Sequence, residues 1–379
     1  MIQSKKVQRK NNMKDITFQP HNEPTADLHT HSQASLDASK PISYLIKKAR
    51  TAKNSILAVS DHNTLKGVNY FLDKKGYSRQ AVMELIDNKT IFLPATEITC
   101  RINEIQNLKG NPTKIHLLAY GLDRDETSFI SQLLSIKHEN DGKVDRGMLA
   151  QFQKHFNLDI SDNDVIKYIA QKRKQEKGFG AFGKNDIFEF SKQLKLHLTD
   201  TDEELREIIH NFKPIERLNL EAKDVINLVH ASGGIVILAH PYTNLKRTSR
   251  AKDIIEYLIT NDIDGFELYH PFNTQPYFDL IQNTIKEHSL ITTGGSDYHD
   301  DNMTWEAFPH HIPYSDPTVK QVKKFIDEMH ELKIKREQGK LMIKDYAGVK
   351  NFKPSETIKK YKSINNQINE SANLDDFVM

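Results

Sequence analysis

Short apolar segments alternate with amphipathic helical segments in two stretches of the chain, from about residue 25 to 121 and from about 221 to 300. Ile42, Leu45, Ile46 and Ala49 recur at helical spacing ahead of the apolar run 55–60, and a similar helix precedes the run 235–239. This alternation predicts strands linked by helices. It favours a parallel sheet with the helices packed outside.

The middle of the chain has a different pattern. Between residues 123 and 218 long charged side chains prevail, and apolar β-branched runs are few. Thr201 and Glu204 have the spacing of a capping box, which predicts the start of a helix. We expect a helical insertion in the sheet domain, with a separately folded subdomain as the alternative.

The two ends of the chain are more polar. Residues 1–22 lack periodicity and are expected to be a flexible leader, whereas residues 319–379 predict a lysine-rich helix and a polar tail with too few apolar residues for its own core. The expected organisation is a leader (1–22), the first part of a barrel (23–122), a helical insertion (123–218), the second part of the barrel (219–318) and a C-terminal extension (319–379) that could dock a protein partner.

Six apolar runs end on histidine, aspartate or glutamate, and this recurrence is the strongest chemical signal in the chain. The runs end at His31, Asp61-His62, Glu97, His116, His240 and Asp297-Tyr298-His299. Imidazole and carboxylate groups bind divalent metals such as zinc and manganese. Barrels of alternating strands and helices build their active sites at the carboxyl ends of the strands. The pattern therefore predicts a polynuclear metal centre.

Two pairs of these residues have a spacing that lets both members bind one ion. His29 and His31 flank one residue of an extended segment, so their side chains point to the same face. Asp297 and His299 repeat that spacing on another strand. Glu97 adds a carboxylate, which can bridge two metals. A lone His-x-His would more often be two surface histidines, so the prediction depends on the whole set.

Composition narrows the class of protein. Of the 379 residues 27% are charged and 37% apolar, and the formal net charge is +2, so no overall field favours nucleic acid or a membrane. The single cysteine, Cys100, excludes an intramolecular disulfide and is expected to be a small buried residue. The sequence lacks an apolar run long enough to span a bilayer, and the amino terminus lacks a secretory signal. We expect a cytoplasmic protein.

In its motifs the chain resembles the polymerase and histidinol phosphatase (PHP) family of phosphoesterases. The similar segments occur in the family's order and are Asp27-Leu28-His29-Thr30-His31-Ser32, Ser60-Asp61-His62-Asn63-Thr64, Glu97-Ile98, Ile115-His116-Leu117-Leu118, Ala239-His240-Pro241 and Gly295-Ser296-Asp297-Tyr298-His299. The resemblance implies an α/β fold, a distorted (β/α)7 barrel of PHP type with a helical insertion and a C-terminal helical, polar extension.

The resemblance also implies three divalent ions, of manganese, zinc or iron, and a division of ligands among them. His29, His31, Glu97 and Asp297 would hold the first ion, and Glu97 would bridge to a second ion bound by His116 and His240. The third ion would be held by Asp37, His62 and His299. The alternative for Asp37 is a helix cap, because its carboxylate is displaced by one residue from the family's pattern.

Two further residues are candidates for supporting roles. Asp61 either orients a ligand by hydrogen bonding or is a simple turn residue. His270 ends another strand, and the resemblance implies that it faces the cleft and contacts the substrate without binding a metal.

The implied reaction is hydrolysis of a phosphate ester by a metal-bridging hydroxide. The chain looks closest to the branch that acts on nucleoside 3′,5′-bisphosphates or degrades short RNA from the 5′ end, so a phosphorylated nucleotide or short nucleic acid is the expected substrate. An arginine-histidine motif in that branch's insertion is replaced here by Lys184 and Asn185. Lys184 and Arg146 are the candidates for phosphate binding, with solvated surface charge as the alternative.

Other interpretations stay open at this point. The basic segment 172–177, followed by Phe179 and Phe182, could contact single-stranded nucleic acid or be a solubilising surface. The enzyme could instead be a small-molecule phosphatase resembling histidinol phosphatase. A different class of function, a non-catalytic assembly module with a structural metal cleft, is disfavoured because nearly every ligand position is filled.

Overall fold

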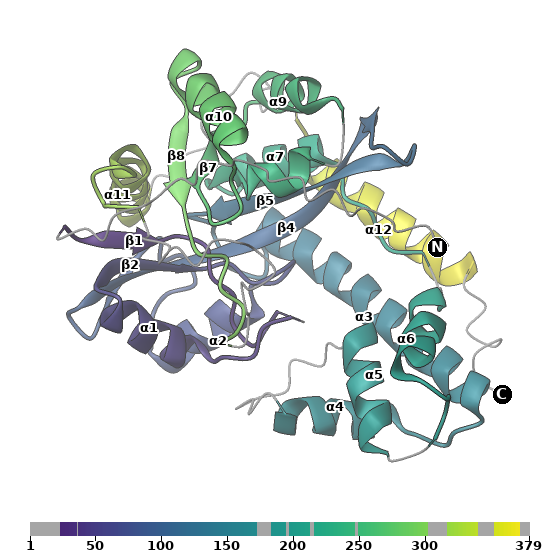
Figure 1. The fold of residues 1–379 in the computed structure, drawn as a ribbon. Helices are drawn as coiled ribbons and strands as arrows, with labels where there is room; N and C mark the ends of the chain where they lie inside the picture. The colour runs from purple at the N-terminus through teal and green to yellow at the C-terminus, as the bar shows by residue number, and fades with distance from the viewer. Residues whose placement is uncertain are drawn as a thin grey trace, which may run out of the picture.

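A mixed β-sheet curved around a buried core positions the candidate site. The computed structural model describes residues 23–35, 37–172, 183–194, 197–212, 216–246, 249–301, 317–339 and 352–371. The strand order is β1-β2-β4-β5-β6-β7-β8, with β3 paired to β4 (Figure 1). The bounds are Thr25–Asp27 (β1), Asn54–Val59 (β2), Glu84–Ile86 (β3), Thr90–Gln106 (β4), Pro112–Tyr120 (β5), Ile235–Leu238 (β6), Gly265–Tyr269 (β7) and Ile291–Gly294 (β8).

The first and last strands of this path are joined by main-chain hydrogen bonds just beyond their carboxyl ends. The Leu28 amide donates to the Gly294 carbonyl at 3.1 Å, and the Asp297 amide donates to the His29 carbonyl at 2.8 Å. Gly295 makes this approach feasible, because a Cβ there would lie 2.4 Å from the His29 main-chain nitrogen. The seven-stranded path therefore closes into a barrel at the residues that the sequence predicts as metal ligands.

One strand runs against the direction that the sequence pattern favours. Strands β1, β2 and β4 are mutually parallel, as are β6, β7 and β8, but β5 is antiparallel to both β4 and β6. The turn at 107–111 is too short for a crossover and reverses the chain, with the Asn107 amide donating to the Asn111 carbonyl. The expectation of a parallel sheet is therefore wrong for β5, and the barrel is mixed.

Helix α11 (Lys323–Glu337) closes the end of the barrel opposite the candidate site. Its Phe325, Met329 and Leu332 are buried in one cluster with inward-facing strand residues. The ring of Phe325 packs edge-on against Tyr120, with 4.9 Å between centroids. Tyr120 pairs with Ile235, the first residue of β6, so this contact lies at the amino-terminal end of the parallel strands.

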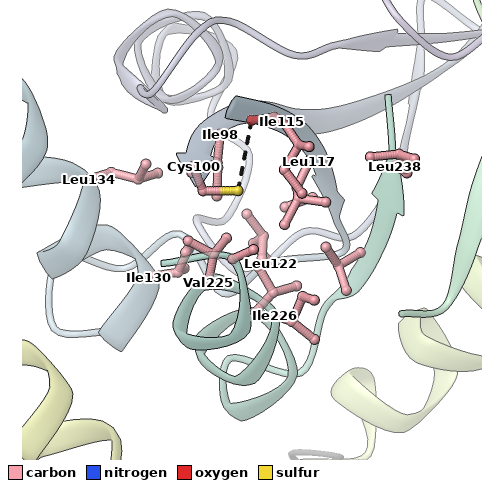
Figure 2. Packing of buried hydrophobic residues seen from close by; sticks show 14 of the residues in the cluster. Ile98, Cys100, Ile115, Leu117, Leu122, Ile130, Leu134, Val225, Ile226 and Leu238 are labelled. Atoms are coloured by element: carbon pink, nitrogen blue, oxygen red, sulfur yellow. Dashed lines mark hydrogen bonds between the residues drawn. The ribbon is translucent and has the colours of Figure 1, made fainter. Parts of the chain in front are cut away.

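Helices cover the outer face of the barrel. They are α1 (Ile42–Thr51), α2 (Lys66–Lys74), α7 (Ala222–Ala231), α8 (Pro241–Leu245), α9 (Ala251–Thr260) and α10 (Gln275–Glu287). Figure 2 shows Val225 and Ile226 of α7 facing Ile98, Cys100 and Ile115 of the sheet. The single cysteine is buried here, as expected, and its thiol donates to the Ile115 carbonyl at 3.8 Å.

The insertion is helical and has a core of its own. It contains α3 (Phe129–Phe156), α4 (Asp162–Lys172), α5 (Lys184–Gln193) and α6 (Asp202–Asn211), and Phe152, Phe188 and Leu205 are buried in a cluster separate from the barrel. At the predicted capping box the Thr201 hydroxyl accepts from the Glu204 amide at 3.2 Å. In Figure 1 α3 extends from the barrel to α4, α5 and α6.

Helix α12 (Pro354–Ser371) packs against α3 and against α7 of the barrel, and its buried residues belong to the main core and not to the insertion's separate cluster. The buried Tyr361 hydroxyl donates to Asp224 of α7 at 2.8 Å and accepts from the Glu221 amide at 2.8 Å. Helices α11 and α12 show how a C-terminal region without its own core can fold, because both bury their apolar side chains against the barrel. Within the described part of the chain, the helices are either too short or too polar to cross a membrane.

Replacing Phe325 by alanine should destabilise the fold by about 3–5 kcal/mol, because it removes a fully buried ring from the closed end of the barrel. Ile334→Ala on the same helix is the matched control; this side chain is exposed and its loss should change the free energy of unfolding by less than about 0.5 kcal/mol. Equilibrium denaturation measures both, and equal effects would contradict the packing of α11.

Candidate metal centre

Four donor atoms from three regions of the chain converge at the first predicted ion site. His29 and His31 follow β1, Glu97 lies on β4 and Asp297 follows β8. The two histidine Nε2 atoms are 3.1 Å apart, and each lies 3.3 Å from Glu97 Oε2. Asp297 Oδ1 lies 3.3 Å from His29 Nε2 and 3.1 Å from His31 Nε2. Five of the six distances among these four atoms thus lie between 3.1 and 3.3 Å, which suits a tetrahedral donor set.

These spacings fit a divalent cation. A tetrahedron with such edges has its centre about 2 Å from each corner, which is the length of a zinc–nitrogen or zinc–oxygen bond. Asp297 Oδ1 is buried and makes no hydrogen bond within the described residues. A buried acceptor without a partner is costly, and a bound cation would supply one. The donor set therefore fits the ion that the sequence predicts.

A second set is centred on the other oxygen of Glu97. Its Oε1 lies 2.8 Å from His116 Nδ1 and 2.8 Å from His240 Nε2. His62 Nδ1 is 3.0 Å from Oε2 of the same carboxylate. Glu97 thus presents one oxygen to the first set and the other to His116 and His240, the arrangement that a bridging carboxylate requires.

The third set contains the residue that was hardest to place from sequence. Asp37 Oδ2 lies 3.4 Å from His62 Nε2 and 3.5 Å from His299 Nε2, and the two imidazole nitrogens are 3.5 Å apart. These three atoms form a nearly equilateral triangle open to solvent on the Asp37 side, where the carboxylate is 54% exposed. The geometry favours the ligand role of Asp37 over that of a helix cap.

Two of the candidate ligands have left-handed backbone conformations. The φ angle is 25° at His240 and 53° at Asp297, values that favour glycine and cost a histidine or an aspartate conformational energy. Hydrogen bonds hold both residues in place. The His240 amide donates to Glu267 Oε2 at 2.6 Å, and the Asp297 amide donates to the His29 carbonyl at 2.8 Å. Such strain is typical of functional sites.

Glu267 is a supporting residue that the sequence-based ligand set omits. It lies on β7 with no exposed surface, and His29 Nδ1 is 3.0 Å from its Oε1. A carboxylate on one imidazole nitrogen orients the ring and makes the other nitrogen a better ligand. The signal was present in the sequence, since Glu267 is an acid inside the apolar run 265–269.

Asp61 contacts the serines beneath His31 and His62. Its carboxylate accepts from the Ser32 amide at 2.6 Å and from the Ser35 hydroxyl at 3.2 Å. The Ser35 oxygen also accepts from the His62 amide and lies 3.2 Å from His31 Nδ1. These contacts support an orienting role for Asp61 over that of a simple turn residue.

His270 lies beneath the centre. Its side chain is fully buried, Nδ1 accepts from the Phe272 amide, and Nε2 lies 3.6 Å from Asp297 Oδ2. Nε2 makes no hydrogen bond within the described residues. The buried position beside Asp297 gives no support to the predicted contact with substrate.

The strand positions of two ligands differ from the sequence-based expectation. Glu97 and His116 lie inside β4 and β5, at the level where the neighbouring parallel strands end, and are not the last residues of their strands. Both strands continue past the barrel as a long hairpin. Ile98 and Cys100 keep one face of this hairpin in the core, whereas Lys114 on the other face is exposed. The continuous apolar runs end where this alternation begins, which polarity alone cannot distinguish from the end of a strand.

Burial and neighbouring charges shift the pKa values of the imidazoles and carboxylates in the centre. Burial raises the pKa of Glu97, but the neighbouring His62, His116 and His29 outweigh it and hold that pKa well below its usual range. Burial lowers the pKa of His116 to about 4, which leaves this ring neutral and able to bind a metal.

The two predicted phosphate contacts lie on the helical insertion. Arg146 is exposed on α3, and Lys184 Nζ donates to the His210 carbonyl at 2.5 Å at the start of α5. The Lys184 contact holds α5 against α6 and gives no support to phosphate binding at this position. Of the predicted basic segment 172–177 with Phe179 and Phe182, all but the backbone of Lys172 lies outside the described residues.

A comparison with protein families finds a matching domain model. The PHP domain model matches residues 27–213, a range that includes His29, His31, Asp37, His62, Glu97 and His116. Among curated proteins, a phosphoribosyl 1,2-cyclic phosphate 1,2-diphosphodiesterase of Eggerthella lenta is 30% identical over 80 residues. That match spans 21% of this chain and 29% of the relative, less than a third of its length.

Solved structures share the fold at low sequence identity. One is a protein of Bifidobacterium adolescentis assigned as a metal-dependent phosphoesterase, with a TM-score of 0.58, 19% identity and coverage of 82% of this chain and 98% of the other. Another is an amidohydrolase of Chromobacterium violaceum with bound sulfate, with a TM-score of 0.54, 16% identity and coverage of 80% and 96%. These likenesses support the predicted α/β fold.

Glu267→Gln should weaken metal binding about 10- to 100-fold, because the neutral amide no longer increases the basicity of His29. Metal content after dialysis against graded chelator measures the effect. Glu287→Gln on the exposed surface of α10 is the matched control and should bind metal like the unmodified chain. Equal metal content in both variants would contradict the orienting role of Glu267.

Proposed function

We propose that the chain, a metal-dependent phosphoesterase whose residues 27–213 match the PHP domain model, hydrolyses phosphate esters of nucleotides or nucleic-acid ends at a centre of three divalent ions. The observation that carries this proposal is the sharing of Glu97 between two donor sets. A carboxylate whose oxygens face separate groups of imidazoles has the geometry of a metal bridge.

The side chains have distinct tasks in this proposal. His29, His31 and Asp297 would hold one ion, His116 and His240 a second, and Asp37, His62 and His299 the third. Glu267 and Asp61 orient the imidazoles from behind. When bound, the ions supply Lewis-acid activation of water and neutralise charge on the phosphoryl oxygens.

The exposure of the donor sets indicates where substrate enters. His29, His31 and Glu97 are buried, whereas Asp37, His62 and His299 are partly exposed. A phosphate group would therefore approach across the third set while the buried carboxylates remain fixed. This asymmetry supports hydrolysis and disfavours a purely structural metal cluster, which would not need an open side.

The substrate class remains a proposal with one alternative. The motifs resemble the nucleotide branch of the family, whereas the matched curated relative is described as acting on a cyclic phosphate of phosphoribose. Both are esters of a phosphorylated sugar, so a ribose phosphate is the shared chemistry. A small-molecule phosphatase of the histidinol phosphatase kind is the alternative.

Removing the metals or their shared ligand should abolish hydrolysis. Exhaustive chelation, His62→Ala and Glu97→Gln should each lower kcat/KM more than about a hundredfold, a larger effect than the loss of an outer hydrogen-bond partner. His288→Ala, an exposed histidine at the end of α10, is the control and should keep full activity. Unchanged hydrolysis by the two centre variants in highly purified protein would refute this assignment of the active site.

A substrate panel separates the nucleotide proposal from its alternative. Metal-loaded protein should hydrolyse nucleoside 3′,5′-bisphosphates, short RNA or ribose cyclic phosphates with kcat/KM at least about tenfold above that for amino-alcohol phosphates, a difference of about 1.4 kcal/mol in transition-state binding. A preference for histidinol phosphate would instead establish the small-molecule phosphatase.

A further inference from the structure

A second concave site lies beside the metal centre, between α2, α3 and α12. This cavity has a volume of about 910 Å³, within the range of small-molecule sites. Thr64 to Lys66 form its wall nearest the centre, two residues after His62 in the chain, yet the nine predicted metal ligands do not line it. It therefore needs an explanation apart from the metals.

The wall contains a buried cation with no carboxylate partner among the described residues. Arg124 has no exposed surface, and its guanidinium donates to Asn69 Oδ1 at 2.8 Å and to the Ser78 carbonyl at 2.9 Å. Its Nε is buried without a hydrogen-bond partner. Arginine is almost never fully buried unless its charge is paired. Arg124 departs from that rule.

The neighbouring charges do not compensate the positive charge of Arg124. Burial and the positive charge of Arg79 together lower the pKa of Arg124 to about 10, although Asp73 acts against them from beyond ion-pair distance. Asp73 itself is bound by Arg79 through two hydrogen bonds, at 2.9 and 2.6 Å. An anion in the cavity would stabilise this charge cluster.

The other charged side chains that line the cavity are also compatible with an anionic ligand. Glu126 lies 3.8 Å from Arg79, and Glu139 accepts from Lys143 at 2.8 Å. Both acidic groups therefore already face a cation. Lys362 of α12 is exposed at the opposite wall, and Lys66 of α2 lies one helical turn from Asn69, the residue that Arg124 contacts.

The other lining groups suit a polar ring. Four amide side chains and one phenol ring are present: Asn69, Tyr70, Gln132, Asn365 and Asn366. Amide groups hydrogen-bond to the edges of heterocycles, and a tyrosine ring can stack on their faces. Asn365 Oδ1 is a second buried polar atom without a partner in the described part of the chain.

We propose that the cavity between α2, α3 and α12 binds a phosphorylated small molecule with a polar ring, such as a nucleoside monophosphate. The exposed Lys66 and Lys362 would contact its phosphate, and the buried charge of Arg124 behind the wall would attract it. This is a second site and does not depend on hydrolysis at the metal centre. A ligand there would hold α12 against α2 and α3, and so would join the C-terminal helix to the first part of the barrel.

The test compares two charge reversals on the same helix. Lys362→Glu lies in the cavity wall, whereas Lys359→Glu is exposed on α12 and does not line the cavity. Adenosine 5′-monophosphate is titrated calorimetrically into the full chain saturated with manganese, and inorganic phosphate is the second probe. Lys362→Glu should weaken the affinity for the nucleotide at least tenfold, and Lys359→Glu should leave it unchanged.

A third variant tests whether the ring of the ligand is recognised as well as its phosphate. Asn366→Asp should also weaken nucleotide binding by adding a negative charge to the wall, and a smaller effect on inorganic phosphate would show that the ring is recognised as well. Equal affinities in the two lysine variants, or a single binding event that Glu97→Gln abolishes, would overturn the proposal. If the protein had no phosphoesterase activity, nucleotide binding that depends on Lys362 could still be measured. The failure of one proposal therefore does not imply the failure of the other.

Discussion

The burial of one carboxylate, that of Glu97, is the constraint on which the centre depends. It has no exposed surface, and imidazoles from four segments of the chain lie within 3.3 Å of its oxygens. An ionised carboxylate is costly to bury unless opposite charge or hydrogen bonds compensate it. Here the compensating groups are themselves metal ligands. The requirement to neutralise Glu97 and the requirement to bind cations are therefore met by the same residues.

This arrangement links catalysis to the closure of the barrel. His29 and Asp297 meet because the first and last strands are hydrogen-bonded beyond their carboxyl ends, and Gly295 permits that approach. The strained backbone of Asp297 is held by the same contacts. Glu267 then ties His29 to the amide of His240 on a third segment. A small movement at the seam would displace ligands of two sets at once, so the site needs a rigid closed sheet.

The site was more predictable from sequence than the sheet that carries it. His-x-His and Asp-x-His spacings place side chains on one face whatever the direction of the strand, so the ligands of the first set could be identified without topology. The direction of β5 depends on a turn that can reverse the chain within five residues, and alternation of strands and helices does not reveal it. Glu267 was left out of the ligand set because an acid inside an apolar run is visible in the sequence, but the residue that it contacts is not. The burial of Arg124 was equally invisible, since its partners Asn69, on α2, and Ser78, in the loop after α2, are distant in the sequence.

The polar C-terminal region shows how composition can mislead about structure. The sequence there is too poor in apolar residues to form a core, and that inference is physically sound. Yet Phe325 and Tyr361 need no core of their own, because the open barrel end and the surface of α7 each supply the apolar contacts that a lone helix lacks. The hydroxyl of Tyr361 and the ammonium of Lys360 both donate to Asp224, a buried acid of the barrel. The extension is thus an integral layer of the fold, and by forming one wall of the cavity it gives a polar segment a place in ligand binding as well as in stability.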